Sequence, residues 1–494
     1  MNPSRVTKAP SARGTGRWAL PVALGLAIAV GSGAAVAEEL TPSWVARLPV
    51  GSALSAGLAG MVVDEAGVAY VTGTSGPSSN TDITTAAVAP DGSLLWSHTF
   101  DGPESWHDQA RGLTLGSDGI LYVTGNTPAP SHHANVLLLR YDAATGALLS
   151  ALQHPGAPGI AEHGASVATD GAGNVFIGGG TAGDGGDALL LAFDADDQLL
   201  WRRVWDGPAL APYSQDSARE ILLDPTGDIV VMIHGVMGSL HPDYVVLKLS
   251  PTDGAIVWEA TWGVAGGDFA TDMEIDELGD VYVTGTGIDF NDKYSTIKLL
   301  GVDGTLIWQA YDAAGIDDYA TALALDGAGG VLVTGSVDHD GDESNFNDNI
   351  YTVRRDATAG TLLWAHEYGE TCIGCFDVPS DVIADGAGHV FVAGSTSSPP
   401  YGADVILMVL DRDSGMETDR GIVSGGATES AGSGVLAFDG GETLYDGGGY
   451  YDFNSGALDM SVTRWPPMGE GETVVLFADD FEAGDTAAWS ALLQ

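Results

Sequence analysis

The segment Gly279-Asp280-Val281-Tyr282-Val283-Thr284-Gly285 decides the fold of this chain. It is a short alternating, β-prone run between two glycines, which is typical of a strand bounded by turns. Similar copies begin at Gly67, Gly119, Gly173, Gly227, Gly329 and Gly388, and a degraded copy begins at Glu442. Successive copies start 50 to 59 residues apart. A period of this length indicates a propeller, a solenoid or another repeat array.

One complete repeat, residues 268–310, is predicted to contain four strands, near 271–275, 281–284, 294–300 and 306–310. Turn residues follow the first and third strands, and a variable loop is expected at 285–293. A central tryptophan marks the fourth strand of most repeats. Antiparallel β structure is therefore expected throughout the repeats, since no stretch shows convincing helical periodicity.

The two ends of the repeat array complement each other. Eight copies of the first three strands are present, but a tryptophan strand is missing after 460–465, while Trp44 stands alone before the first copy. An N-terminal strand that completes the last repeat would close a ring and remove its open edges. The sequence therefore predicts an all-β, eight-bladed β-propeller of four-stranded antiparallel blades, closed by an N-terminal strand. Seven blades is the alternative, because the eighth copy is the least regular.

The composition restricts the partners of the chain. Acidic residues number 67 against 18 basic ones, a net charge of −49. Nucleic acid and anionic membrane surfaces are disfavoured, since both require clustered Lys and Arg. Divalent cations, basic partners and plain solubility remain compatible with this charge. We expect a monomer with an unidentified protein or polysaccharide ligand.

The two ends of the chain lie outside the repeats. Residues 1–37 have a basic start, an apolar run and small residues at 35–37, which predicts an export signal and a secreted, periplasmic or cell-surface protein. No second run is long enough to span a membrane. The propeller is expected at 38–465 and a separate tail at 466–494. Cys372 and Cys375 predict a small local disulfide.

Part of the repeat resembles a known family. The bacterial SBBP-type β-propeller repeat has a similar order of motifs, which this chain shows at 294–298, 304–308, 318–322, 326–329 and 333–335. The likeness covers roughly residues 42 to 465 and implies an exported propeller. The Trp and Gly spacing also resembles, more loosely, the repeats of eight-bladed quinoprotein dehydrogenases. The tail, with Phe481–Asp485 and Trp489-Ser490, resembles C-terminal sorting or docking tails of exported bacterial proteins.

One acidic position recurs eleven residues before the glycine that opens the second strand. It is occupied in units two to seven by Asp108, Glu162, Asp216, Asp268, Asp318 and Asp377. In a propeller these carboxylates would surround one mouth of the central channel. Two carboxylates about 10 Å apart repel by roughly 0.4 kcal/mol in water, but by roughly 1.7 kcal/mol at an effective dielectric of 20. A dry ring therefore needs cations, bound water or raised pKa values, unless each Asp caps its own turn.

A second set of short polar residues is expected on the same face, where the third strands begin. It consists of Asp82, Asn135, Asp187, Asp243, Asp348, Asp404 and Asp459. The longest loop on this face runs from Asp338 to Asp348, and its oxygen ligands would be Asp338, Asp340, Asp342, Asn345, Asn347 and Asp348. Such ligands suit calcium, although the loop departs from the twelve-residue calcium-binding pattern.

Two functional hypotheses follow. The first is an exported, non-enzymatic binding scaffold that uses its acidic loop face, with calcium as a candidate cofactor. The alternative is an exported hydrolase, lyase or quinoprotein-like oxidoreductase with its site at the channel mouth. No catalytic residue is assigned, and Arg219 and His107, beside Asp216 and Asp108, are the nearest candidates.

Overall fold

The computed structural model describes residues 38–48, 57–77, 79–104, 106–129, 133–156, 159–182, 186–207, 216–237, 241–263, 267–289, 291–312, 314–339, 348–369, 376–397, 403–424, 429–440, 443–452 and 458–468. The predicted export signal, nearly all of the tail, Cys372, Cys375 and residues 340–347 of the predicted calcium loop lie outside these ranges. Within them, no helix has the length and apolar character needed to cross a membrane.

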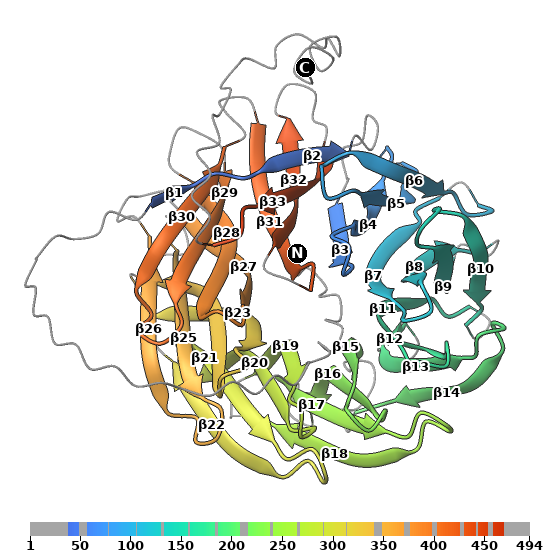
Figure 1. Ribbon diagram of the computed structural model, residues 1–494. Coiled ribbons are helices and arrows are strands. Elements are labelled where there is room, and N and C mark those ends of the chain that lie inside the picture. The colour runs from blue at the N-terminus through green and yellow to red at the C-terminus, as the bar shows by residue number, and fades with distance from the viewer. Residues whose placement is uncertain are drawn as a thin grey trace, which may run out of the picture.

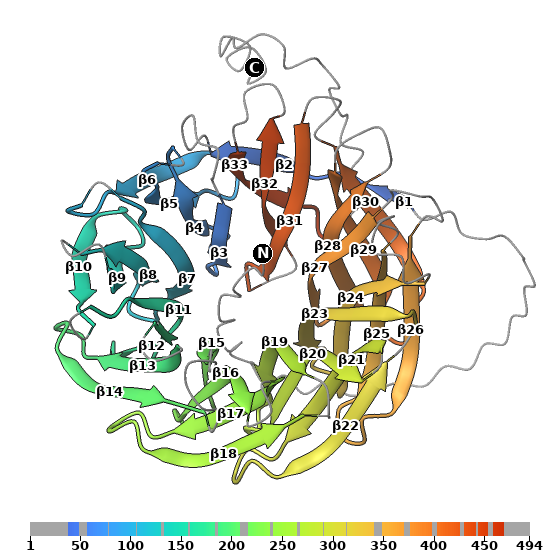
Figure 2. The ribbon, with the colours of Figure 1, turned by 180° about the vertical axis from the view of Figure 1, so that it is seen from behind.

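Eight β-sheets surround a central axis, which confirms the predicted eight-bladed propeller and excludes seven blades (Figures 1 and 2). Blades are numbered here in chain order. Their innermost strands are β3 (Gly57–Val63), β7 (Gln109–Leu115), β11 (Glu162–Thr169), β15 (Ser217–Leu223), β19 (Asp268–Ile275), β23 (Asp317–Leu325), β27 (Phe376–Ala384) and β31 (Glu429–Phe438). Their second strands are β4 (Ala69–Ser75), β8 (Ile120–Pro128), β12 (Val175–Thr181), β16 (Ile229–Met237), β20 (Val281–Asp289), β24 (Gly330–Asp338), β28 (His389–Ser397) and β32 (Leu444–Asp452).

The remaining strands form the outer half of each blade. The third strands are β5 (Asp82–Val88), β9 (Ala134–Asp142), β13 (Asp187–Phe193), β17 (His241–Leu249), β21 (Asn291–Leu299), β25 (Asn349–Asp356), β29 (Ala403–Asp411) and β33 (Leu458–Trp465). The outermost strands are β6 (Leu94–Phe100), β10 (Leu148–His154), β14 (Leu199–Trp205), β18 (Ile256–Trp262), β22 (Leu306–Asp312), β26 (Leu362–Tyr368), β30 (Glu417–Val423) and, in blade 8, β2 (Trp44–Leu48). In blade 5, β20 and β21 extend into the segment where a variable loop was predicted.

The ring closes as predicted. The N-terminal strand β2 pairs antiparallel with β33, with Trp44 opposite Arg464 and Leu48 opposite Met460. A second N-terminal strand, β1 (Glu38–Leu40), was not predicted and adds a fifth strand to blade 7, parallel to β30. Figure 1 shows β1 and β2 in blue along the outside of blades 7 and 8. One short segment therefore joins the last two blades at the outer rim.

The hydrophobic core lies between neighbouring blades, because each blade is apolar on both faces. Between blades 3 and 4, for example, Phe176 and Leu190 pack in one cluster with Val231 and Val245. Buried side chains also tie the innermost strands together across these contacts. A carboxylate or hydroxyl accepts a backbone N–H of the next blade in the pairs Ser166–Ile221, Glu220–Met273, Asp272–Leu323 and Asp381–Leu436.

The repeated tryptophans connect the blades at the outer rim. Each indole Nε1 donates to a backbone carbonyl in the turn between the third and outermost strands of the next blade, at distances of 2.7 to 3.1 Å. The rings lie against a glycine in the same turn, in the pairs Trp44–Gly92, Trp96–Gly146, Trp201–Gly254, Trp258–Gly304, Trp308–Gly360 and Trp364–Gly415. Trp44 extends this contact from blade 8 to blade 1, so it also closes the ring.

The junction between blades 2 and 3 is built differently. Ser150 stands at the tryptophan position of blade 2, opposite Arg140. In the facing turn of blade 3, Asp197 adopts a φ of 63°, the only positive value of a non-glycine residue in the described chain. Arg140 forms an ion pair with Asp197 at 2.8 Å and donates to the carbonyl oxygens of Asp194 and Ala195. A guanidinium therefore replaces the indole at this junction.

The tryptophan contact leads to a stability prediction. Gly304 has a φ of +72°, and a Cβ there would lie 2.7 Å from Cε3 of Trp258. Gly304→Ala should therefore cost roughly 2–5 kcal/mol, from left-handed backbone strain and overpacking together. Gly119 has a similar φ of +77° but nothing within 4 Å of its Cβ position. Gly119→Ala, the matched control, should cost only about 1–2 kcal/mol. Urea unfolding midpoints measure both, and equal losses would contradict the proposed tryptophan contact.

Candidate functional site

The repeated carboxylates lie where the innermost strands begin. Glu162 and Asp268 open β11 and β19, Asp318 and Asp377 are the second residues of their strands, and Asp108 and Asp216 immediately precede theirs. All are buried, with at most 3% of any of these residues exposed. Burial of an ionised carboxylate is costly unless it receives hydrogen bonds or a counter-charge. The groups that compensate the negative charge of each carboxylate therefore show how each blade junction is stabilised.

Backbone amides compensate several of these carboxylates, in the manner of turn caps. Asp318 accepts from the N–H groups of Ala314 and Gly315 at 2.9 Å. Asp216 accepts from Gly207 N–H at 2.8 Å, and Asp108 accepts from Gly102 N–H at 2.6 Å. Glu162 has a full counter-charge, because Arg202 Nη2 lies 2.6 Å from its Oε1. The kind of compensating group thus differs from junction to junction.

Among the described residues, two junctions bring three carboxylates together. The first group is Asp82, Asp101 and Asp108, and the second, two blades further on, is Asp187, Asp206 and Asp216. In each group, one ligand oxygen from every residue lies within 4.8 Å of the others. The sequence placed the third-strand aspartates and the repeated acids on one face, but it did not single out Asp101 and Asp206. In blade 6 the third strand begins with Asn349 rather than Asp348.

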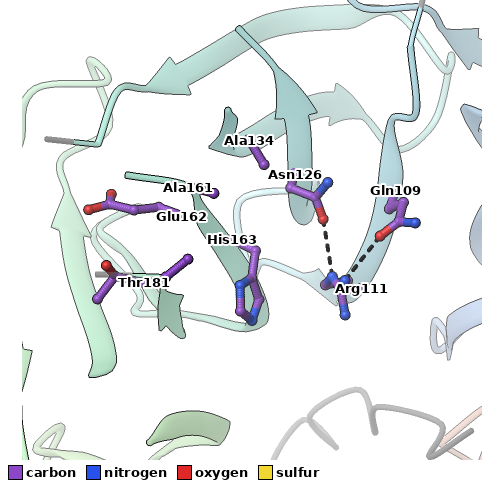
Figure 3. A pocket seen from close by; sticks show the side chains of 9 residues that line it. Gln109, Arg111, Asn126, Ala134, Ala161, Glu162, His163 and Thr181 are labelled. Atoms are coloured by element: carbon purple, nitrogen blue, oxygen red, sulfur yellow. Dashed lines mark hydrogen bonds between the residues drawn. The ribbon is translucent and has the colours of Figure 1, made fainter. Parts of the chain in front are cut away.

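A pocket of about 230 Å³ opens between the inner parts of blades 2 and 3. Gln109 and Arg111 from β7 and Asn126 from β8 form one side, and Glu162 and His163 from β11 form the other (Figure 3). Arg111 is held in place because its Nε donates to Asn126 Oδ1 at 3.2 Å and its Nη2 donates to Gln109 Oε1 at 3.0 Å. The pocket therefore contains a fixed guanidinium whose described partners are neutral amides.

Basic groups extend from this pocket along the innermost strands. Arg219 on β15 is exposed although its strand faces the axis, so solvent reaches the inside of the ring. Burial and the charge of Arg219 lower the pKa of Arg111. Burial, with the charges of Arg111 and Arg219, lowers the pKa of His163 to about 4. Burial and Arg219 likewise lower the pKa of His234 to about 4. Both imidazoles are therefore neutral at pH 7.

Arg219 has no hydrogen bond or ion pair to any other residue in the described part of the chain. This is unusual in a protein whose net charge is −49. Aromatic groups follow on the next innermost strands: Phe269 stacks on His234 with ring centroids 5.2 Å apart, and Phe269 and Tyr319 are 41% and 46% exposed. The inside of the ring thus offers cationic donors beside accessible aromatic faces. This arrangement suits a planar ligand with negative charges.

Sequence reasoning identified only part of this basic group. Arg219 was a candidate, but Arg111, His163 and His234 were missed. A signal was present, because Arg111 and Arg219 both stand three residues after a repeated acid, at Asp108 and Asp216. His107, the other candidate, is exposed, and its Nδ1 lies 3.3 Å from Thr81 Oγ1. In the predicted calcium loop, only Asp338, His339 and Asp348 are described, and burial raises the pKa of Asp348.

Comparisons with known proteins agree with the β-propeller fold. A family model, PQQ_2, described as "Outer membrane protein assembly factor BamB", matches residues 133–311, from the third strand of blade 2 to the outermost strand of blade 5. No curated protein matches the chain. The quinohemoprotein alcohol dehydrogenase of Comamonas testosteroni is similar in structure, with a TM-score of 0.55 and 12% identity over 89% of this chain and 79% of that chain.

Two further solved structures show the same architecture. The quinohemoprotein alcohol dehydrogenase ADHIIG of Pseudomonas putida HK5 has a TM-score of 0.54 and 13% identity, over 89% of this chain and 78% of that chain. A europium-containing methanol dehydrogenase has a TM-score of 0.52 and 12% identity, over 86% of this chain and 93% of that chain. At such identities the likeness shows the fold alone.

Proposed function

We propose that this chain is a quinoprotein-like oxidoreductase that binds a planar, carboxylate-bearing quinone inside its ring. The observation that carries this proposal is that Arg219, which has no ion pair in the described part of the chain, lies close to Arg111, His163 and His234 in a strongly acidic chain. The guanidinium groups of Arg111 and Arg219 repel each other, and a bound anion would relieve this repulsion. The fold of the quinoprotein dehydrogenases and the PQQ_2 match support the same ligand class.

The residues present fit the charged and planar parts of such a cofactor. Arg111 and Arg219 would hold its carboxylates, and Gln109 and Asn126 offer amide donors beside Arg111. Phe269 and Tyr319 offer exposed rings for its flat face. When bound, a quinone supplies two-electron redox chemistry, in which it accepts a hydride equivalent from a substrate such as an alcohol. His163 would be neutral at pH 7, because its pKa is about 4, and would add no positive charge beside the ligand.

Binding of pyrroloquinoline quinone itself tests the proposal. Calorimetry with the purified protein should show binding, and Arg219→Gln or Arg111→Gln should weaken it by about 10- to 100-fold, the equivalent of one charge-assisted hydrogen bond. Arg412→Gln is the matched control, because it makes the same charge change at the outer turn of blade 7. The loaded protein should also reduce an artificial electron-acceptor dye when an alcohol is added.

Benzene-1,3,5-tricarboxylate separates the two parts of the proposal. Binding of this compound without binding of the quinone would support an anionic ligand and contradict the quinoprotein function. Binding of neither compound, or equal binding by the wild type and both arginine variants, would contradict the site itself.

A second candidate function is the binding scaffold expected from the sequence, with a protein or polysaccharide partner. Pairs of exposed apolar residues at the start of the outermost strands favour it, among them Leu94-Leu95, Leu199-Leu200 and Leu362-Leu363. They repeat around the rim, as an extended contact surface would require. This function needs no ligand inside the ring, so it predicts that Arg111→Gln and Arg219→Gln leave partner binding unchanged.

A further inference from the structure

The junction between blades 1 and 2 contains a group of carboxylates that the proposed function does not use. Asp82 opens β5, Asp101 follows β6, and Asp108 precedes β7 in the next blade. One oxygen from each carboxylate lies within 4.8 Å of the other two. Asp108 is fully buried, Asp82 is half-buried and Asp101 is exposed, so the group extends from the blade interface to solvent.

Buried oxygen atoms in this group lack hydrogen-bond partners. Oδ2 of Asp108 accepts from Gly102 N–H at 2.6 Å, but its Oδ1 and Oδ1 of Asp82 accept no hydrogen bond from the described residues. The hydroxyl of Thr127, whose residue is 0% exposed, interacts with Asp108 and lowers the pKa of that carboxyl, but it makes no hydrogen bond of ordinary geometry to a described residue. Buried oxygens of this kind are rarely left unsatisfied in proteins, because desolvation without a new bond is costly. The arrangement therefore indicates that something else satisfies them.

These oxygens converge beside Gly102. A Cβ at that residue would lie 2.5 Å from Thr127 Oγ1 and 2.8 Å from Asp108 Oδ1. The glycine therefore leaves open the space that a side chain would fill. A neutral hydroxyl oxygen and a carboxylate oxygen share this space, a mixture of ligand types that is typical of hard-cation sites.

The neighbouring junction shows what this position requires. There, Glu162 occupies the place of Asp108, and the guanidinium of Arg202 supplies a positive charge 2.6 Å from its Oε1. No Lys, Arg or His forms an ion pair with Asp82, Asp101 or Asp108 in the described chain. Burial raises the pKa of Asp108, and the charges of Asp82 and Asp101 act in the same direction, while hydrogen bonding from Thr127 and Gly102 opposes the shift. A cationic side chain is thus present at one junction, and a bound cation could take its place at the other.

We propose that Asp82, Asp101 and Asp108, with the hydroxyl of Thr127, bind one calcium-sized divalent cation between blades 1 and 2. Calcium accepts six to eight oxygen ligands at about 2.3–2.6 Å in a flexible geometry, whereas magnesium demands a near-ideal octahedron at about 2.1 Å, so a mixed carboxylate and hydroxyl group of this kind suits calcium better. A divalent ion neutralises two of the three carboxylate charges, and water can complete the coordination on the exposed side of Asp101.

The same set of positions recurs two blades on, which indicates a second site of the same kind. Asp187 opens β13, Asp206 follows β14 and Asp216 precedes β15. Gly207 N–H donates to Asp216 Oδ2 at 2.8 Å, as Gly102 N–H does to Asp108. The sequence Asp-Gly-Pro also recurs, at 101–103 and at 206–208. In the other six blades the residue directly after the outermost strand is not acidic: it is Pro49, Pro155, Gly263, Ala313, Gly369 or Ser424.

Calcium titration of the chelator-treated protein tests the inference, with calorimetry and terbium luminescence as readouts. Calcium should bind and raise the melting temperature. Asp101→Asn should weaken binding at the first site by about 10-fold or more, since calcium affinity depends on the number of charged ligands. Because Asp101 is exposed, this variant should fold normally, which circular dichroism can check. Asp413→Asn removes the same charge from a residue whose side chain is 74% exposed, outside either group, and should bind as the wild type does.

The variant Asp206→Asn, and the double variant that combines it with Asp101→Asn, show which calcium ion binds at which junction. We expect each single variant to lose one site and the double variant to lose both. The inference would be overturned if the wild type failed to bind millimolar calcium, or if Asp101→Asn left every site unchanged. A loss caused only by Asp206→Asn would also overturn it for the junction between blades 1 and 2. Quinone binding by the Asp101→Asn variant should be unchanged, so failure of either proposal can be recognised separately.

Discussion

Deleting residues 38–48 should open the ring and cost roughly 5 kcal/mol or more. The deletion removes five paired residues of β2, each worth about 0.5–1.5 kcal/mol in net hydrogen bonding, and the burial of Leu48, worth about 1.5–3 kcal/mol. It also removes the bond from Trp44 Nε1 to Pro90 O and the stacking of the Arg47 guanidinium 3.9 Å from the centre of the Tyr450 ring. Domains are commonly stable by only about 5–15 kcal/mol, so this loss is a large fraction.

Thermal melting and light scattering measure the effect. The truncated chain should melt at lower temperature and associate, because the edge of β33 loses its partner. A synthetic peptide of residues 38–48 added in trans should restore the monomer. Deletion of 38–41 alone removes only β1 from blade 7 and serves as the control, with a smaller expected loss. A truncated chain that stayed monomeric with an unchanged melting temperature would contradict closure by β2.

Asp446→Asn should change the dependence of stability on pH. Asp446 lies on β32, is 2% exposed, and its Oδ1 accepts from Ser433 Oγ at 2.6 Å. Burial raises its pKa from 3.8 to about 7, and the carboxylate of Asp381 contributes in the same direction. Between these values the folded protein keeps a proton that the unfolded chain has lost. Stability therefore falls as pH rises from about 4 to 7, by about 1.4 kcal/mol per unit and roughly 4 kcal/mol in total.

The asparagine variant remains neutral and keeps an oxygen for Ser433. It should match the wild type near pH 4 and exceed it near pH 8, by up to roughly 4 kcal/mol. Melting curves of both proteins at pH 4 to 8 check this, because the difference between them isolates Asp446 from all other acidic groups. Parallel pH profiles would show that Asp446 is ionised in the folded protein across this range.

The sequence predicted the architecture well because each blade is specified locally. Alternation within strands and the Asp-x-x-Gly turns depend on residues close together in the chain, as at Asp276, which accepts from the N–H groups of Leu278 and Asp280. Closure by the N-terminal strand was also predictable, because Trp44 matches a motif that the last repeat lacks. The strand β1 was missed because Glu38–Leu40 carries no such motif and is only three residues long.

The candidate sites were less predictable because they combine different positions of neighbouring blades. Asp82, Asp101 and Asp108 come from a strand start, a strand end and a loop, and only the register of the sheets brings them together. The basic group at Arg111, His163 and Arg219 comes from three innermost strands that follow one another about 50 residues apart. Burial of the repeated acids was equally inaccessible to sequence reasoning, since it depends on how closely the innermost strands pack.

The exchange of indole for guanidinium at one junction makes that junction sensitive to the surrounding medium. An indole contact is little affected by electrolyte, whereas an ion pair such as Arg140–Asp197 weakens as ionic strength rises, to the extent that solvent reaches it. In blade 2, Gly112 occupies the innermost-strand position that Glu220 holds in blade 4 and Asp272 holds in blade 5. Glycine has no side chain, so this position cannot bond to the next blade as those two carboxylates do. The pocket opens between these same two blades. The two blades that line the pocket are thus joined at their outer turn by an ion pair instead of an indole contact.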